Sequence, residues 1–336
     1  MRVLFVRFGS IGNALVSVPA IRAIRKAHPS AFLALLCDPN TYQLWKDCPW
    51  LDQVIIYDQK KAHKAGIGYL KLIAQLRRLK FTHSVHFRRF LRSELLGFLA
   101  GAKERAGFDP GGFSLLTQKI PYSEEEHIID QNLKLAQALG ARELDPALEY
   151  WTAPPSEKVQ QILSQIPSPR IILHPFARTQ AQRRWSGFVP LSEKIARELL
   201  LHPIIIGTRE EEKIYHKEWG EKSELVYPVF GLSIPELASL LAHSQLFIGM
   251  DSGPLHLACA VQIPAIAIYV PELRLEKNLK KWKPKSEKFY AIIPDKSCSN
   301  CSAYPCSPET LKSCLERISE ENVLNICQKI LNEIKK

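Results

Sequence analysis

Residues 249–258 read GMDSGPLHLA, a Gly- and Ser-rich turn that follows the strand-like run 246–248 and leads into an apolar helix. A strand that ends in small residues and opens a helix presents unpaired backbone N–H groups at the positive end of the helix dipole, which favours a bound phosphate. Asp251, Ser252 and His256 add side-chain hydrogen-bonding capacity. The stretch therefore predicts a nucleotide-phosphate site; the alternative is an ordinary helix N-cap followed by a packed helical histidine.

Strand-like runs alternate with helical patterns on both sides of this turn. In the first half of the chain the strand-like runs are residues 3–6, 32–36, 54–57 and 85–87. In the second half they are residues 171–173, 203–206, 246–248 and 265–269. Helical patterns lie between them, and residues 233–236 (Ser-Ile-Pro-Glu) have the capping-box pattern that begins a helix. This alternation predicts an α/β fold in which each half forms a parallel sheet covered by helices on both faces.

A proline-rich segment, residues 146–169, separates the two halves and predicts an interdomain connector. We expect an N-terminal domain over 1–155 and a C-terminal domain over 156–336, both of a size that is usual for one domain. A terminal helix is expected over 319–336, packed back on the N-terminal domain. Its apolar face is formed by Val323, Cys327, Ile330, Leu331 and Ile334.

The composition is that of a globular chain with an excess of positive charge. Of the 336 residues, 46% are hydrophobic and 24% are charged, and the formal net charge is +11. Such a charge attracts a polyanion: nucleic acid, an acidic membrane surface or a phosphorylated substrate. No apolar run approaches the ~20 residues that span a bilayer, and arginines and glycines interrupt the N-terminal segment. We therefore expect a cytoplasmic protein without a membrane anchor or signal peptide.

Four of the eight cysteines fall within residues 298–314: Cys298, Cys301, Cys306 and Cys314. In a cytoplasmic chain such clustering favours a metal over disulfides. Four thiolates suit a tetrahedral structural site for zinc or iron, and a site with four protein ligands leaves no open position for catalysis. The alternative is a reduced, partly buried cluster of thiols.

Three features occur in an order that resembles the lipopolysaccharide heptosyltransferases of glycosyltransferase family 9: the first strand and loop (residues 2–13), the turn 251–258 and the late cysteines. Residues 92–93, 183–185 and 207–210 agree as well, so the resemblance runs from end to end. It implies the GT-B architecture, in which two Rossmann-like doubly wound domains face a central cleft. It also implies inverting transfer of heptose from ADP-heptose to a lipopolysaccharide core or related phosphorylated glycan, without a catalytic cofactor.

The resemblance assigns the nucleotide-sugar to the C-terminal domain. Arg183 would neutralise the diphosphate, with the adjacent Arg184 as second candidate, and Glu210 would lie near the ribose. The alternative for the two arginines is a solvated basic turn. Four residues of the turn would hold the diphosphate itself: Asp251, Ser252, Gly253 and His256.

The acceptor is assigned to the N-terminal domain, as a lipid-linked glycan at the inner face of the membrane. A cationic rim would concentrate such a phosphorylated substrate, which places the protein at the membrane periphery. Three arginines follow the fourth predicted strand at its carboxyl end, where ligands of open α/β sheets bind, although a solvated helix start explains them as well. The acceptor-binding candidates are Gly12, Arg88, Arg89 and Arg92.

The catalytic base is where the chain departs from the family pattern. The family has an aspartate after the glycine of the first loop, and this chain has Asn13, whose amide orients a hydroxyl but does not remove its proton. After the fourth strand the family usually has an acidic residue, and this chain has His86. Because the first and fourth strands of a doubly wound sheet are neighbours, we expect Asn13 and His86 to meet, with His86 as the base. The alternative for His86 is a packing role; His83 and Glu94 are weaker candidates.

Other functions compete with this interpretation. A chain that lost catalysis at Asn13 would be a nucleotide-binding scaffold of the same fold, and a different nucleotide-sugar could replace ADP-heptose as donor. A metal-stabilised nucleic-acid-binding protein is disfavoured, because no run of Lys and Arg interleaved with aromatic residues adjoins the cysteines.

Overall fold

Apolar runs of the first half form a six-stranded sheet whose neighbouring strands are all parallel. The computed structural model describes residues 1–64, 66–176, 184–219, 223–269, 275–294 and 308–334. The strand order is β3-β2-β1-β4-β5-β6. The strands are β1 (Arg2–Arg7), β2 (Phe32–Cys37), β3 (Gln53–Ile56), β4 (His83–His86), β5 (Glu104–Phe108) and β6 (Gln118–Ile120).

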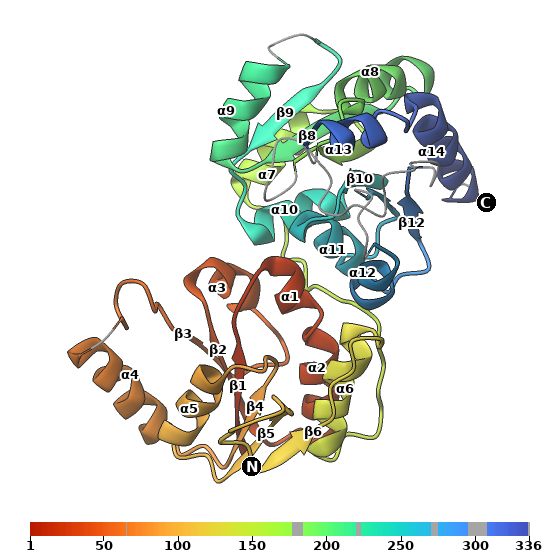
Figure 1. Cartoon of the computed structure of the whole chain (residues 1–336). Helices are drawn as coiled ribbons and strands as arrows, with labels where there is room; N and C mark the ends of the chain where they lie inside the picture. The colour runs from red at the N-terminus through yellow and green to blue at the C-terminus, as the bar shows by residue number, and fades with distance from the viewer. Residues whose placement is uncertain (65, 177–183, 220–222, 270–274, 295–307, 335–336) are drawn as a thin grey trace. The chain divides into compact units, whose positions relative to one another are not determined.

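Helices cover both faces of this sheet, with α4 and α5 on one side and α2 and α6 on the other (Figure 1). The central strand β1 is buried from Val3 to Val6, as expected for a strand with parallel neighbours and helices on both faces. The helices are α1 (Ile11–Leu15), α2 (Val18–Ala27), α3 (Pro39–Trp45), α4 (Ile67–Arg78), α5 (Leu91–Leu99) and α6 (Ile128–Ala138).

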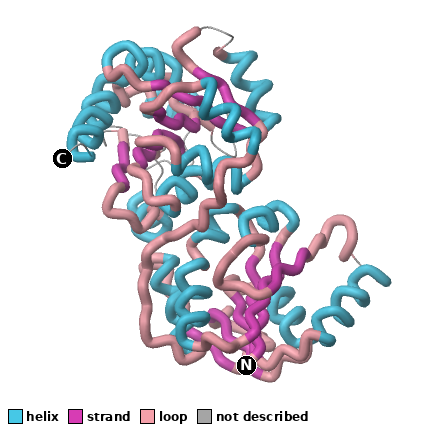
Figure 2. The backbone as a smooth tube through the Cα atoms, turned by 180° about the vertical axis from the view of Figure 1, so that it is seen from behind, coloured by secondary structure: helices cyan, strands magenta, loops and turns pink. Residues whose placement is uncertain are grey.

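The second half repeats this topology, again with parallel neighbours throughout, in the order β12-β11-β10-β7-β8-β9. Helices again accompany the strands, as Figure 2 shows from behind. The strands are β7 (Arg170–His174), β8 (His202–Gly207), β9 (Tyr227–Phe230), β10 (Leu246–Met250), β11 (Ala265–Ile268) and β12 (Phe289–Ile292). The helices are α7 (Glu157–Gln165), α8 (Phe188–Glu198), α9 (Arg209–Glu218), α10 (Ile234–Ala242), α11 (Gly253–Ala260), α12 (Leu275–Trp282), α13 (Pro308–Leu315) and α14 (Glu320–Ile334).

Two compact units result. Unit 1 comprises Met1–Trp151 with Lys280–Trp282, and unit 2 comprises Thr152–Leu279 with Lys283–Lys336. The chain thus passes between units a few residues before the expected boundary after residue 155. The capping box at Ser233 and Glu236 begins α10 as the sequence predicts.

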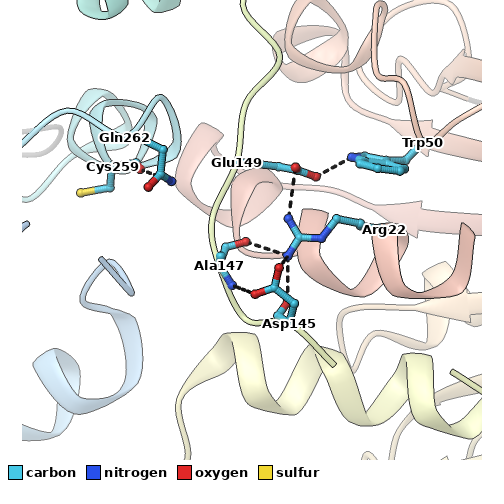
Figure 3. A network of polar contacts seen from close by, with 7 residues as sticks. All are labelled: Arg22, Trp50, Asp145, Ala147, Glu149, Cys259 and Gln262. Atoms are coloured by element: carbon cyan, nitrogen blue, oxygen red, sulfur yellow. Dashed lines mark hydrogen bonds and ion pairs between the residues drawn. The ribbon is translucent and has the colours of Figure 1, made fainter. Parts of the chain in front are cut away.

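The end of unit 1 is fastened to α2 by a buried arginine (Figure 3). The Arg22 guanidinium donates to the Asp145 carboxylate at 2.8 Å and to the Ala147 carbonyl at 3.1 Å. Its other terminal nitrogen lies 3.1 Å from the Glu149 carboxylate, which also accepts the Trp50 indole N–H. The segment that leads to unit 2, residues 145–149, thus neutralises the charge of Arg22 and accepts its hydrogen bonds.

The terminal helix corrects one expectation. The apolar face of α14 lies in the core of its own unit, where Val323, Leu324 and Cys327 pack with β-strand residues such as Ile171 and Ile248. That face was expected to pack back on the N-terminal domain. Within the described residues, no helix is long and apolar enough to cross a membrane.

Candidate functional site

The turn after β10 places Ser252 at the N-cap of α11 in an extended conformation. In the part of the chain that the structure describes, the Ser252 side chain caps no backbone N–H of this helix. Its Oγ lies 3.1 Å from Nδ1 of His174 instead. The N–H groups at the start of α11 therefore keep their capacity to bind an anion, which favours the phosphate-site interpretation over the ordinary N-cap.

His174 is the last residue of β7 and lies opposite Gly249 of β10. Its side chain is buried, and its Nε2 is 3.9 Å from Oε2 of Glu211. The same carboxylate oxygen accepts the Thr208 backbone N–H at 2.7 Å, which completes the capping box of α9. Burial acts to raise the pKa of Glu211, but the interactions with His174 and Thr208 outweigh it and hold the pKa below its usual value. A polar chain, Ser252–His174–Glu211, thus links the carboxyl ends of β10, β7 and β8.

Close backbone packing holds the Ser252–His174–Glu211 series in place. A Cβ on Gly249 would lie 3.1 Å from the His174 carbonyl oxygen and 2.7 Å from the Phe247 ring. Glycine alone leaves room for the two strands and the ring at this point. The turn that carries Ser252 is therefore held close to the end of β7.

The other predicted donor residues have different surroundings. Asp251 is exposed beside Ser252, Gly253 is half-buried at the start of α11, and His256 is buried within that helix. Glu210 is exposed on the first turn of α9. Arg183 lies outside the described residues.

Arg184, the second phosphate candidate, is already paired. Its Nη1 lies 2.8 Å from Oε2 of Glu218 on α9, and its side chain is mostly buried. The sequence did not single out His174 or Glu211, although His174 ends a predicted strand and the Thr208-to-Glu211 spacing is that of a capping box.

In unit 1, the first loop is built around a buried arginine at the end of β1. Arg7 Nε donates to the Asn13 backbone oxygen at 2.7 Å, and Nη2 lies 3.4 Å from Asn13 Oδ1. Asn13 Nδ2 in turn donates to Ser10 Oγ at 3.1 Å. Burial and then Arg88 lower the pKa of Arg7 to about 9, and Asp38 opposes them. The Asn13 amide is therefore part of the internal structure of the loop.

Asp38, which follows β2, contacts the same loop and was not predicted from the sequence. Its Oδ2 accepts the Gly9 backbone N–H at 2.6 Å. Gly9 has φ +131°, and a Cβ there would lie 3.1 Å from Asn13 Nδ2 and 3.3 Å from Arg88 Nη1. Glycine at this position thus lets Asp38, Asn13 and Arg88 gather at the carboxyl ends of β2, β1 and β4.

His86 corrects the hypothesis for the catalytic base. Its side chain is completely buried, with Nε2 2.8 Å from Ser84 Oγ, and it lies against Gly97 of α5, where a Cβ would approach Nε2 to 2.7 Å. Burial and then Arg105 lower its pKa to about 3. An acceptor hydroxyl has no access to this imidazole, so His86 has a packing role beneath α5.

The weaker base candidates are also engaged in the fold. His83 Nδ1 lies 2.8 Å from Thr82 Oγ1 at the first residue of β4, away from its carboxyl end. Glu94 is buried, and its Oε2 accepts the Ser114 hydroxyl and the Leu115 N–H, both at 2.8 Å.

The acceptor-binding candidates follow β4 as predicted. The Arg88 guanidinium lies over the Phe90 ring at 4.5 Å, and that of Arg89 over the Tyr122 ring at 3.9 Å. Arg89 also pairs with Glu124 at 3.4 Å, and Arg92 Nε donates to the Tyr57 hydroxyl at 3.2 Å. Gly12 is buried within α1. The arginines therefore share one edge of the sheet, and each has an aromatic neighbour.

The predicted metal site falls mostly outside the described residues. Cys298, Cys301 and Cys306 are among those left undescribed, while Cys314 is buried on α13. Among the residues that are described, no group of three or more His, Cys, Asp or Glu side chains is placed to hold a metal ion.

Comparison with known proteins identifies the family of this chain. Residues 69–312 match the family model described as glycosyltransferase family 9 (heptosyltransferase). The chain is 23% identical to lipopolysaccharide heptosyltransferase 3 of Escherichia coli over 77% of this chain and 80% of that one.

Two solved structures share the fold over nearly the whole chain. The glycosyl transferase family 9 protein from Veillonella parvula has a TM-score of 0.83 at 19% identity and covers 99% of this chain and 97% of that one. The E. coli ADP-heptose lps heptosyltransferase II has a TM-score of 0.76 at 18% identity, with both chains covered completely.

The surroundings of His86 yield a prediction. Replacing His86 with Ala should lower the free energy of unfolding at pH 7 by about 2–4 kcal/mol, because it leaves a cavity beneath α5. Turnover per folded molecule should stay within about twofold of wild type. Urea unfolding and activity assays measure both, and His83→Ala, at the half-exposed start of β4, is the matched control.

The low pKa adds a pH dependence to this experiment. Below about pH 6.5 the unfolded chain binds a proton that buried His86 does not, so the stability of the wild type falls as the pH falls toward 3. The His86→Ala variant has no imidazole to protonate and does not lose this stability. The difference in free energy of unfolding between wild type and variant should therefore fall by about 2 kcal/mol between pH 7 and pH 5. A stable variant without turnover would restore His86 as the base.

Proposed function

This chain belongs to glycosyltransferase family 9 and is a glycosyltransferase, and we propose that it transfers heptose from ADP-heptose to a lipopolysaccharide core or related phosphorylated glycan. The reaction inverts the anomeric carbon. The relatives whose names specify heptosyl transfer support this choice of donor and acceptor.

One observation carries the proposal: the Ser252 hydroxyl is held by His174 at the start of α11 and does not cap that helix. The diphosphate binds there, accepting hydrogen bonds from Ser252 and from the N–H groups at the start of α11. Negative charge grows on the diphosphate as its bond to the sugar breaks, and preorganised donors stabilise that charge. Asp251, Gly253 and His256 complete the turn, and Arg183 is the cation that we assign to the diphosphate, because Arg184 is paired with Glu218.

Two alternatives remain open. The diphosphate is common to many nucleotide-sugars, so the turn itself is compatible with a donor other than ADP-heptose. Asn13 favours a nucleotide-binding scaffold without turnover, because its amide accepts no proton.

A combined experiment tests the proposal and separates these alternatives. We expect ADP to bind and heptose to be transferred from ADP-heptose to a crude lipopolysaccharide-core acceptor, as followed by calorimetry and mass spectrometry. Replacing Ser252 with Ala should weaken ADP binding at least about tenfold, because one hydrogen bond to a charged group is lost. Ser164→Ala, at an exposed position on α7, should leave ADP binding unchanged.

The outcomes distinguish the three functions. ADP binding without transfer to any acceptor would favour the scaffold, and transfer from another nucleotide-sugar alone would replace the donor. Equal ADP affinities for wild type and Ser252→Ala would remove the turn from the donor site.

We further propose that the protein acts at the cytoplasmic face of the inner membrane and contacts it through unit 1. Residues 60–105 carry twelve lysines and arginines and two glutamates, so this span holds a net charge of +10 of the chain's +11. Glu94, one of the two, is buried. The positive charge that the composition reveals is therefore concentrated on α4, α5 and their loops.

The same span exposes apolar side chains, which together we name the α4–α5 face. Leu91, Leu95 and Phe98 lie on one side of α5, because spacings of four and three residues bring side chains above one another. Phe98 is 50% exposed and carries Arg105 over its ring at 5.5 Å. The two helices lie side by side (Figure 1). The face consists of Ile67, Leu70, Phe90, Leu91, Leu95 and Phe98.

An exposed apolar face flanked by cations matches the chemistry of an anionic bilayer surface. We expect the protein to bind vesicles that contain about 30 mol% phosphatidylglycerol, and to dissociate as salt is raised. Phe98→Glu should weaken binding at least about tenfold, since it removes apolar burial and adds like charge to the lipid. Cosedimentation measures this, with Leu225→Glu, exposed in unit 2, as control. Equal binding by both variants would contradict the α4–α5 face.

The late cysteines support a structural metal. Four thiolates within residues 298–314 form a donor set that suits zinc or iron, which would fasten the segment before α14. Elemental analysis of the reduced protein should find about one metal ion per chain, and Cys298→Ser should lower that content. Cys48→Ala, at an isolated buried cysteine, should retain it. Absence of metal from the wild type would leave a thiol cluster.

A further inference from the structure

Inverting transfer requires a group that accepts the proton of the attacking hydroxyl. Asn13 lacks the basicity, and both ends of its amide are engaged by Arg7 and Ser10. His86 is buried beneath α5. The proton acceptor therefore has to come from another element that reaches the first loop.

We propose that Asp38 is the catalytic base, an inference that rests on the proposed function. Asp38 follows β2 and is half-buried, and its Oδ2 is fixed by the Gly9 N–H at 2.6 Å. Among the described residues no hydrogen bond is donated to its second oxygen, Oδ1, which is left to accept one from an acceptor hydroxyl. Asp38 binds the backbone of Gly9, and the other face of this glycine lies close to Asn13 and Arg88. Both residues are site candidates of the N-terminal domain, to which the resemblance assigns the acceptor.

The charges of the loop explain why a carboxylate belongs at position 38. Arg7 is buried, and a buried cation requires a negative partner nearby. An aspartate at position 13 would supply that partner directly, since Arg7 Nη2 already lies 3.4 Å from Asn13 Oδ1. In this chain residue 13 is neutral, and Asp38 is the carboxylate that acts on Arg7. The negative charge of the site has moved from the first loop to the end of the adjacent strand.

The groups around Asp38 are cationic or neutral. Arg7 on β1 and Arg88 after β4 are cations that share the first loop with it. The neighbouring Cys37 thiol is buried, and burial raises its pKa to about 12, so it is neutral. Asp38 is therefore the carboxylate that lies between these cations, with Oδ1 left for an acceptor hydroxyl.

The step balances as a displacement. An acceptor hydroxyl donates its proton to Asp38 Oδ1 while its oxygen forms a bond to the anomeric carbon of the donor. The bond from that carbon to the diphosphate oxygen breaks, and its electron pair leaves with the nucleoside diphosphate. The protonated Asp38 then returns its proton to solvent. Asn13 supports the loop through Arg7 and Ser10, and Arg88 attracts the phosphorylated acceptor.

Asp38→Asn tests this role because it removes the basicity of the side chain and keeps its shape; it also removes the negative partner of Arg7, so turnover is measured per folded molecule. The amide oxygen still accepts the Gly9 N–H, so the loop keeps its support, but the side chain no longer takes a proton. We expect turnover to fall at least about 100-fold, with ADP affinity unchanged. Asp58→Asn, the same exchange after β3, contacts the turn at Lys60 and Lys61 and should leave turnover unchanged.

A second substitution separates catalysis from loop support. Adding Asn13→Asp to the Asp38→Asn variant returns a carboxylate to the loop beside Arg7, and turnover should recover at least about tenfold. A purely structural role of Asp38, as the negative partner of Arg7, would instead lower the free energy of unfolding of Asp38→Asn in urea and leave its turnover per folded molecule near wild type.

The outcomes are distinct. Asp38→Asn with near wild-type turnover overturns the base while leaving the proposed function intact. Wild-type protein without transfer to any acceptor overturns the proposed function and the base together.

Discussion

The candidate site residues of both units depend on a reversal of strand order in each of the two sheets. Between β1 and β4, and again between β7 and β10, the connections leave in opposite directions, so the carboxyl ends of these strands are open to a ligand. Arg7 and Arg88 come from the first pair, and His174 and Ser252 from the second. The central strands are buried between helices, and at these ends polar groups meet across strands that are far apart in sequence.

At both places where the strand order reverses, a buried basic side chain lies near a carboxylate, but the arrangement differs between the two units. In unit 2 a buried histidine links a hydroxyl to a carboxylate, so the Glu211 charge is compensated within the protein and the helix start is left for an anion. In unit 1 a buried arginine is compensated by a carboxylate one strand away, and the loop between them presents a neutral amide. In our proposals, the end in unit 2 receives negative charge and the end in unit 1 receives a proton.

The sequence predicts the architecture well, because the architecture follows from patterns between residues that are close together in the sequence. Apolar runs of three to five residues and the Ser233 capping box are local signals, and two doubly wound parallel sheets follow from them. The partners of the site are not local. His174 and Asp38 gain their roles from residues on neighbouring strands, which no spacing in the sequence reveals. His86 was misassigned for a related reason: as the second residue after Ser84 it shares that residue's face of the sheet, and that face is covered by α5.

The concentration of charge in residues 60–105 also affects how the protein meets its surroundings. With +10 in this span, the charges of the other residues sum to nearly zero, so the net charge of the protein originates almost entirely from one segment of unit 1. At physiological ionic strength the field of this charge decays over about 8 Å, which is too short to draw the protein from a distance. This range is long enough to orient the protein once it is within a few ångströms of an anionic surface, so that residues 60–105 face the surface on contact. Orientation on encounter is then selected before any apolar side chain is desolvated.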